Sequence, residues 1–446
     1  MSKPLPVTPA YRTFLTVWAG QLVSNLGSSL SRWALGFWVF VETGSTTQLG
    51  LVIMAARLPS LLISPFAGAL VDRWSRRSAM ILSDAGAAIG TLAIAILVAT
   101  NNLEIWHLYV ALSISSAFGA FQFPAYSAAT TLLMPKEHHG RAAGLVQLAG
   151  SAGAVLGPFL GAAFLVSAGL ATVFVADLVS FAIAVATLSV VRFPEPEKLH
   201  APVRGLRGLL AEARAGLDYV IARRGLLGLM LTFAAVNLAI TFHSILVFPL
   251  LLGFTTETSA GAIISIGALG MVVGSTVMSF RGGPNRRVRG LMISLAIAGA
   301  GLMIAGWRPT AVSVTTGIFI VLVAVPIAAG ISQAIWQSKI PPDLQGRVFS
   351  LRLMMAMAAT PFAYVLAGTL ADRVFEPLLA PSGLLAGSLG SLIGTGPGRG
   401  VGALFIVLGI AIVGIVATAI RNDRIRNLEV EVPDAIPDSL SGDVLL

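Results

Sequence analysis

The stretch 401–420, VGALFIVLGIAIVGIVATAI, contains no charged side chain and decides the environment in which this protein folds. A helix of ~20 residues is long enough to cross the hydrocarbon core of a bilayer. In hydrocarbon every backbone N–H and C=O group needs an internal partner, so a single apolar stretch of this length is expected to be helical. This stretch therefore predicts a membrane-spanning helix.

Eleven further stretches of the same kind precede it. The composition agrees, since 56% of the 446 residues are hydrophobic and only 11% are charged, which is little charge for a soluble domain. The sequence predicts an all-α membrane protein with twelve transmembrane helices. The expected spans are 14–41, 48–71, 78–99, 105–134, 141–166, 170–191, 226–252, 259–280, 289–306, 311–335, 347–371 and 401–420.

The distribution of lysine and arginine predicts the orientation of these spans. With the N-terminus in the cytoplasm, 24 of the 29 basic residues fall in cytoplasmic loops and termini. The positive-inside rule then places both termini in the cytoplasm, which for a bacterial protein means insertion in the cytoplasmic (inner) membrane. The net charge of +9 is explained by this topology, so it does not indicate a nucleic-acid partner.

Several classes of site are excluded or unsupported. The chain has no cysteine, which excludes disulfides and thiolate metal sites, and its five histidines show no metal-ligand spacing. A GxxxxGK[ST] phosphate loop is absent, and no nucleophile–base pair stands out. We predict a protein that is not an enzyme, with neither a metal nor a cofactor. The first apolar stretch is too long for a cleaved signal peptide and is expected to be a retained anchor.

A long polar stretch after the sixth span divides the chain. It separates an expected six-helix bundle, 1–191, from a second one, 226–420, and a short acidic tail, 421–446, is expected to be disordered. Apolar residues at helical spacing in the connecting segment 192–225 predict an amphipathic helix on the cytoplasmic membrane surface. A plain solvated linker is the alternative.

The two halves resemble each other at an offset of 206 residues. The fourth span is followed by PKEHHGR (135–141) and the tenth by PPDLQGR (341–347), which share the pattern PxxxxGR. The same offset superimposes Gly68, in the loop after the second span, on Gly274, in the loop after the eighth. Matching loops in a six-plus-six arrangement predict two pseudo-repeats, a common architecture of secondary transporters.

The loop after the second span, GALVDRWSRR (68–77), is similar to the signature GxLxDRxxRR of the major facilitator superfamily. The fifth span resembles a second family pattern, G-x8-G-x3-GP-xx-GG, which is associated with exporters that work as antiporters; Ala162 replaces its last glycine. The resemblance covers essentially the whole chain. Four phrases resemble the branch of enterobactin exporters and macrolide efflux pumps: RWALGFWVFVETGS (32–45), FQFPAYSAATTLLMP (121–135), GTLADRVFEPLL (368–379) and GTGPGRG (394–400).

The resemblance implies roles for both motifs. Asp72 would hold a cytoplasmic gate closed by accepting N–H groups at the start of the eleventh span. The remaining positions of this inner gate motif are Gly68, Arg73, Arg76 and Arg77, and the arginines could instead serve only to anchor the topology. In the antiporter-type motif, small residues would let a neighbouring helix approach closely. Its positions are Gly144, Gly153, Gly157, Pro158 and Gly161.

Polar and charged residues within the spans are the other candidates, since such residues are costly in hydrocarbon and often functional. They are Arg32, Arg57, Asp84, Asp177, Asn237 and His243. We expect Asp177 to be either a structural ion-pair partner of an arginine or a protonation site coupled to transport. For His243 the alternatives are a hydrogen-bonded packing residue and a coupling residue.

These observations predict a secondary active transporter that exports an amphipathic small molecule by proton antiport and alternating access. A siderophore, a peptide-like metabolite or a macrolide-like drug fits the resemblance. Its expected partners are this substrate, protons and membrane lipids, and it is expected to function as a monomer. Import by symport is one alternative, and a non-transporting membrane scaffold or sensor is another.

Overall fold

The computed structural model describes residues 9–71, 74–133, 139–191, 214, 217–281, 283–284, 286–341, 344, 348–349, 351–352, 355–356 and 359–434. Every regular element in these ranges is helical. Nine helical segments there are long and apolar enough to cross a membrane. The prediction of an all-α protein with many membrane spans is thus confirmed, whereas the twelve-span count and the cytoplasmic location of both termini stay predictions.

The chain divides into two compact units. Unit 1 comprises residues 1–203 together with 255–265, and unit 2 comprises 204–254 and 266–446. The predicted boundaries of the two bundles and their linker stay predictions. The connecting segment lies largely outside the described residues, at 192–213 and 215–216.

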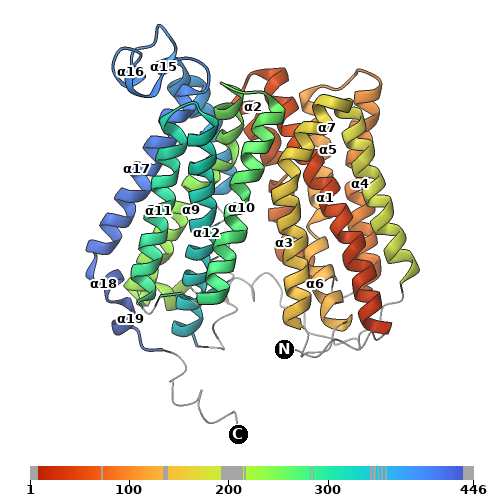
Figure 1. Ribbon diagram of the computed structural model, residues 1–446. Coiled ribbons are helices and arrows are strands. Elements are labelled where there is room, and N and C mark those ends of the chain that lie inside the picture. Colours follow the sequence, from red (N-terminus) through yellow and green to blue (C-terminus); the bar gives the residue numbers. More distant parts are fainter. Residues whose placement is uncertain are drawn as a thin grey trace. The chain divides into compact units, whose positions relative to one another are not determined.

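Unit 1 is built mainly from α1 and α7, which pack along each other, and from α4, which packs on α5, α6 and α7 (Figure 1). Its helices in the described ranges are α1 (Pro9–Thr43), α2 (Thr46–Ala55), α3 (Leu58–Val71), α4 (Arg76–Ala99), α5 (Ile105–Gly119), α6 (Gln122–Leu133) and α7 (His139–Val190).

The expected second span is two helices, because Pro59 has no N–H to donate to the carbonyl of Ala55. α2 ends there and α3 begins at residue 58. The hydroxyl of Ser113, on α5, lies 3.4 Å from the Ala55 carbonyl oxygen, and Ser116 accepts the N–H of Ser60 at 3.1 Å. Neighbouring serines thus satisfy backbone groups that the break leaves free, as membrane depth requires.

The expected fourth span is interrupted in the same way. α5 ends at residue 119 and α6 begins at Gln122, and Pro124 has no N–H for the carbonyl of Ala120. The hydroxyl of Ser83, on α4, donates to the carbonyl of Phe118 at 2.9 Å. This break places Gln122 in the first turn of α6, part way along the expected span.

The fifth and sixth expected spans form the two parts of α7. Gly169 has a non-helical conformation with φ of 77° and turns the chain between them. A positive φ is accessible to glycine at little cost, because glycine has no Cβ to clash with the backbone. The turn lies between the expected spans 141–166 and 170–191.

Unit 2 is built around α11, which packs on both α12 and α17. The long helices of this unit in the described ranges are α9 (Arg224–Leu252), α10 (Glu257–Arg281) from residue 266 on, α11 (Arg287–Trp307), α12 (Ala311–Lys339), α14 (Thr360–Leu370) and α17 (Arg399–Arg421). Glycines permit both contacts. A Cβ on Gly317 would lie 2.4 Å from the Ala305 nitrogen, and one on Gly306 would lie 2.2 Å from the Gly402 carbonyl oxygen.

The connection between α14 and α17 is folded. It holds a π-helical turn, Ala371–Phe375, and two short helices, α15 (Glu376–Leu379) and α16 (Leu389–Ile393). A side-chain oxygen of Glu376 accepts the N–H of Val401 at 3.0 Å, which caps the first turn of α17. Arg399, 2% exposed, donates to the carbonyls of Gly306 and Trp307 at 2.7 and 3.2 Å, where α11 ends.

The C-terminal segment 422–434 is ordered. It contains α18 (Asp423–Arg426) and α19 (Leu428–Glu431), and Ile425 and Leu428 are buried. Lys339 at the end of α12 donates to the carbonyls of Glu429 and Val432 at 2.9 and 2.6 Å. The expectation of a disordered tail from residue 421 is therefore wrong for 422–434, because two apolar side chains and a buried lysine hold this segment. Residues 435–446 lie outside the described ranges.

Candidate functional site

The predicted gate motif is only partly described. Gly68 lies in α3, whereas Asp72 and Arg73 fall outside the described residues. The guanidinium of Arg76 donates to the carbonyl of Val71 at the end of α3, and that of Arg77 donates to the carbonyl of Ser189 near the end of α7. Both arginines thus bind carbonyls at helix C-termini, where a positive charge is favourable.

Three glycines of the antiporter-type motif, Gly153, Gly157 and Gly161, face α1 within unit 1. A Cβ on Gly157 would lie 2.3 Å from the Ser29 hydroxyl, and a Cβ on Gly161 would lie 2.8 Å from the Leu30 carbonyl oxygen. The hydroxyl of Ser29 donates to the carbonyl of Gly153 at 2.7 Å, which adds a polar contact between the helices. The three glycines therefore let α1 and α7 approach to backbone distance.

The other two positions of this motif also lie in α7. Gly144 is in its first part, and Pro158 lies inside the helix beside Gly157. Because proline lacks an N–H group, Pro158 cannot donate to the carbonyl of Ala154.

Asp177, on α7, is 3% exposed and is surrounded by serines. The hydroxyls of Ser28 and Ser31 donate to its two carboxylate oxygens at 3.2 and 2.8 Å, and the hydroxyl of Ser180 lies 3.5 Å from the first of them. Arg32 lies close enough to interact electrostatically with this carboxylate. The main partners of Asp177 are therefore hydroxyl groups.

The two arginines expected near Asp177 lie close to each other. Arg32 is exposed on α1, and Arg57 is exposed in the turn between α2 and α3. The two guanidinium groups are close enough to repel each other. The ion pairs recorded among the described residues involve neither of them. The structure thus brings Arg32, Arg57 and Asp177 into one neighbourhood without a direct arginine–aspartate pair.

Asp84, on α4, is 4% exposed and is bound by amides. The side-chain nitrogen of Gln21, on α1, donates to the Asp84 carboxylate at 3.0 Å. The side-chain nitrogen of Gln122, on α6, donates to the Gln21 carbonyl oxygen at 2.6 Å. Sequence reasoning singled out Asp84 but missed both glutamines, although an uncharged amide inside an apolar span was a visible signal.

The candidates in unit 2 lie apart from these clusters in the sequence. The side-chain nitrogen of Asn237, on α9, donates to the carbonyl of Ala356 at 2.8 Å. His243, also on α9, is 7% exposed, and its ring centroid lies 5.5 Å from that of Phe405. Its Nε2 atom has no hydrogen-bond partner among the described residues. Asn237 thus has a structural role in joining two helical segments.

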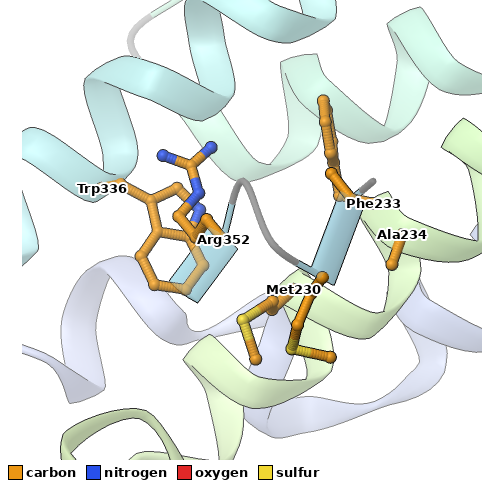
Figure 2. Close-up of a pocket in the computed structure, with 7 residues that line it drawn as sticks. Met230, Phe233, Ala234, Trp336 and Arg352 are labelled. Carbon is orange, nitrogen blue, oxygen red and sulfur yellow. The ribbon is translucent and has the colours of Figure 1, made fainter. Parts of the chain in front are cut away.

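A small cavity in unit 2 lies beside Arg352, another residue that sequence reasoning missed. The cavity is about 10 Å³, room for roughly one water molecule, and Figure 2 shows Arg352 stacked on Trp336 at its edge. The Arg352 guanidinium lies 4.7 Å from the Trp336 ring centroid and donates to Ser332 and Gln333. In this conformation the cavity is too small for a drug-sized ligand. Its lining residues are Met230, Phe233, Ala234, Trp336, Arg352, Met355 and Ala356.

Comparison with known proteins gives a match over most of the chain. The family model described as Major Facilitator Superfamily matches residues 17–363. Macrolide efflux protein A of Streptococcus pyogenes is 30% identical over 375 residues, which cover 81% of this chain and 90% of that protein. The multidrug efflux pump Tap of Mycolicibacterium fortuitum is 28% identical over 376 residues, which cover 80% and 89%.

Solved structures show the same fold at low identity. The nucleoside transporter NupG has a TM-score of 0.65 at 14% identity, and the alignment covers 91% of this chain and 98% of that one. A bacterial homologue of the human lysosomal transporter Spinster also has a TM-score of 0.65, at 15% identity, with coverage of 94% and 95%.

Proposed function

The chain belongs to the major facilitator superfamily, as a multi-pass protein of the bacterial inner membrane, and we propose that it exports amphipathic small molecules by proton antiport. Alternating access would carry the substrate out of the cell while a proton moves inward. Both termini would lie in the cytoplasm, as the distribution of basic residues predicts.

The observation that carries the proton-coupling proposal is the pair of buried carboxylates in unit 1. Asp84 and Asp177 are 4% and 3% exposed, and the groups bonded to them are amides and hydroxyls. Burying a carboxylate in an apolar region is costly, and its neutral form is much less so. A carboxyl group of this kind is suited to binding a proton in one step of a cycle and releasing it in another.

The direction and substrate class are proposed from the relatives. Proteins named for macrolide efflux and multidrug efflux align with about four fifths of this chain. Both names denote export, and macrolides are large amphipathic molecules. We therefore take a macrolide as the first substrate to test.

The experiment uses everted membrane vesicles, in which the periplasmic face points inward. An acidic vesicle interior should drive accumulation of radiolabelled erythromycin, and nigericin, which collapses the pH gradient, should release it. Vesicles without the protein are the control for passive binding.

Three other outcomes would contradict the proposal. Accumulation driven by a sodium gradient and unaffected by nigericin would exclude proton antiport. Substrate loss from the vesicles together with protons would indicate the importer alternative. Binding without flux, for a panel of amphipathic compounds, would favour a non-transporting scaffold or sensor.

A further inference from the structure

Three polar side chains from three helices form a continuous hydrogen-bonded chain in unit 1. It runs from Gln122 on α6 through Gln21 on α1 to Asp84 on α4, with donor–acceptor distances of 2.6 and 3.0 Å. The Gln122 amide is also close enough to interact with the Asp84 carboxylate. A change at the carboxyl group therefore reaches two other helices through hydrogen bonds.

The hydrogen-bonded series of Gln122, Gln21 and Asp84 begins at a helix break. Gln122 is the first residue of α6, directly after the interruption that Pro124 imposes between α5 and α6. Broken helices within membrane-spanning regions recur at the substrate and ion sites of transporters, where they expose polar groups at depth. The break thus makes this position different from a regular span with a single buried carboxylate.

Two buried polar atoms at this place lack a partner among the described residues. They are the side-chain oxygen of Gln122 and the hydroxyl of Tyr126, one turn further along the same face of α6. A buried acceptor without a donor is costly. When Asp84 is protonated, its O–H group becomes a hydrogen-bond donor in this cluster. The unpaired side-chain oxygen of Gln122 can accept that hydrogen bond.

Among the described residues, no cation is found to interact with Asp84. The charged and titratable groups on the helices around it include Arg12 and Arg32 on α1, Arg76 and Arg77 on α4, Tyr126 on α6 and Asp177 on α7. The groups found to interact with Asp84 are Gln21 and Gln122, and none of these six is among them. α5 meets this part of α4 through Phe118, which accepts from Ser83.

Asp177 differs in this respect. Hydroxyls of Ser28 and Ser31 donate to its carboxylate, and Arg32 adds a positive charge in its neighbourhood. A positive charge favours the ionised form, and no positive charge among the described residues is found to interact with Asp84. The Asp84 cluster also holds an unpaired acceptor, the side-chain oxygen of Gln122.

We propose that Asp84 is the carboxyl group that binds and releases the transported proton, and that Gln21 and Gln122 are positioning residues that transmit its protonation to α1 and α6. The proton would arrive from periplasmic water, form an O–H bond at the carboxylate, and leave to cytoplasmic water. This inference rests on the proposed proton antiport.

The first test compares Asp84→Asn with Thr91→Val, a matched control that changes another buried polar residue of α4. In everted vesicles, Asp84→Asn should lose accumulation of erythromycin against its gradient. It should retain exchange of labelled for unlabelled substrate, and that exchange should become independent of pH. Thr91→Val should keep both accumulation and the wild-type pH profile.

The second test needs no variant, so it holds even where Asp84→Asn fails to fold. Dicyclohexylcarbodiimide modifies protonated carboxyl groups in apolar surroundings, and mass spectrometry locates the product. In the wild-type protein, the modification should map to Asp84, slow as pH rises, and slow further with erythromycin. Modification at Asp177 alone would overturn the assignment.

The outcomes separate the site from the function. If the wild-type protein does not accumulate substrate under a pH gradient, the proposed antiport fails. If the wild type does so, and Asp84→Asn still concentrates substrate with unchanged pH dependence, antiport stands and Asp84 is not its proton site.

Discussion

The packing of α7 on α1 gives a graded prediction, because three glycines of one helix have different surroundings. A Cβ on Gly150 would meet nothing within 4 Å, and one on Gly153 would lie 3.3 Å from the Ser29 Cβ atom. A Cβ on Gly161 would lie 2.8 Å from the Leu30 carbonyl oxygen and 2.9 Å from the Ala34 nitrogen. An alanine Cβ would therefore meet open space at Gly150, a side chain at Gly153 and backbone atoms at Gly161.

The expected magnitudes follow from two opposing terms. Alanine favours a helix over glycine by ~0.8–1.0 kcal/mol, which should make Gly150→Ala neutral or mildly stabilising. Overpacking costs ~1–3 kcal/mol, and backbone atoms cannot rotate away as a side chain can. Gly161→Ala should therefore lower the free energy of unfolding by up to ~2 kcal/mol after the helix term is subtracted. Gly153→Ala should fall between the two.

The assay is reversible unfolding of the purified protein in mixed micelles, followed by tryptophan fluorescence, together with erythromycin transport in vesicles. Transport should fall in the same order as stability if close approach of α1 and α7 is needed in the cycle. Gly157→Leu should abolish transport, because even its Cβ would overlap the Ser29 hydroxyl at 2.3 Å. Equal unfolding free energies for Gly150→Ala and Gly161→Ala would refute the packing argument.

Four further predictions concern single contacts. Ser31→Ala should lower the free energy of unfolding by about 1.5–3 kcal/mol, because Asp177 loses a charge-assisted hydrogen bond; no change in chemical denaturation would contradict this. Lys339→Met should release the C-terminal segment, seen as faster proteolysis after residue 421, whereas unchanged cleavage would show that apolar contacts suffice. Burial raises the pKa of Glu376 above its ordinary value of 4.5, so the folded state binds more protons than the unfolded state, and stability should fall as pH rises from 4.5; Glu376→Gln should remove that slope. Asp72→Asn should speed cysteine labelling of the cytoplasmic vestibule, and equal labelling with equal transport would argue against the gate.

Sequence reasoning found the class of fold because hydropathy acts over whole spans. It placed the turn between the fifth and sixth spans close to Gly169. It missed both helix breaks, although Pro59 and Pro124 were visible, because average hydropathy does not respond to a single absent N–H group. Proline alone does not mark a break either, because Pro158, Pro249 and Pro326 lie inside helices that continue through them.

Two basic residues show another limit of prediction from sequence. Sequence reasoning gave no role to Arg399 or Arg352, yet Arg399 is 2% exposed and Arg352 stacks on Trp336. Their acceptors are carbonyls and hydroxyls of distant residues, such as Gly306 for Arg399. Such acceptors carry no sequence signal, because every residue has a carbonyl group.

The contrast between Asp84 and Asp177 follows from the same limit and has the larger consequence. From sequence both are single acidic residues in apolar spans, and Asp177 attracted the coupling hypothesis because arginines were expected at its depth. Their chemistry depends on partners 63 and 146 residues away, Gln21 for Asp84 and Ser31 for Asp177. Asp177 has an arginine in its neighbourhood, which favours a retained charge, whereas the Asp84 cluster holds an unpaired amide oxygen that can accept an O–H group. On this contrast we propose Asp84, rather than Asp177, as the coupling carboxyl group.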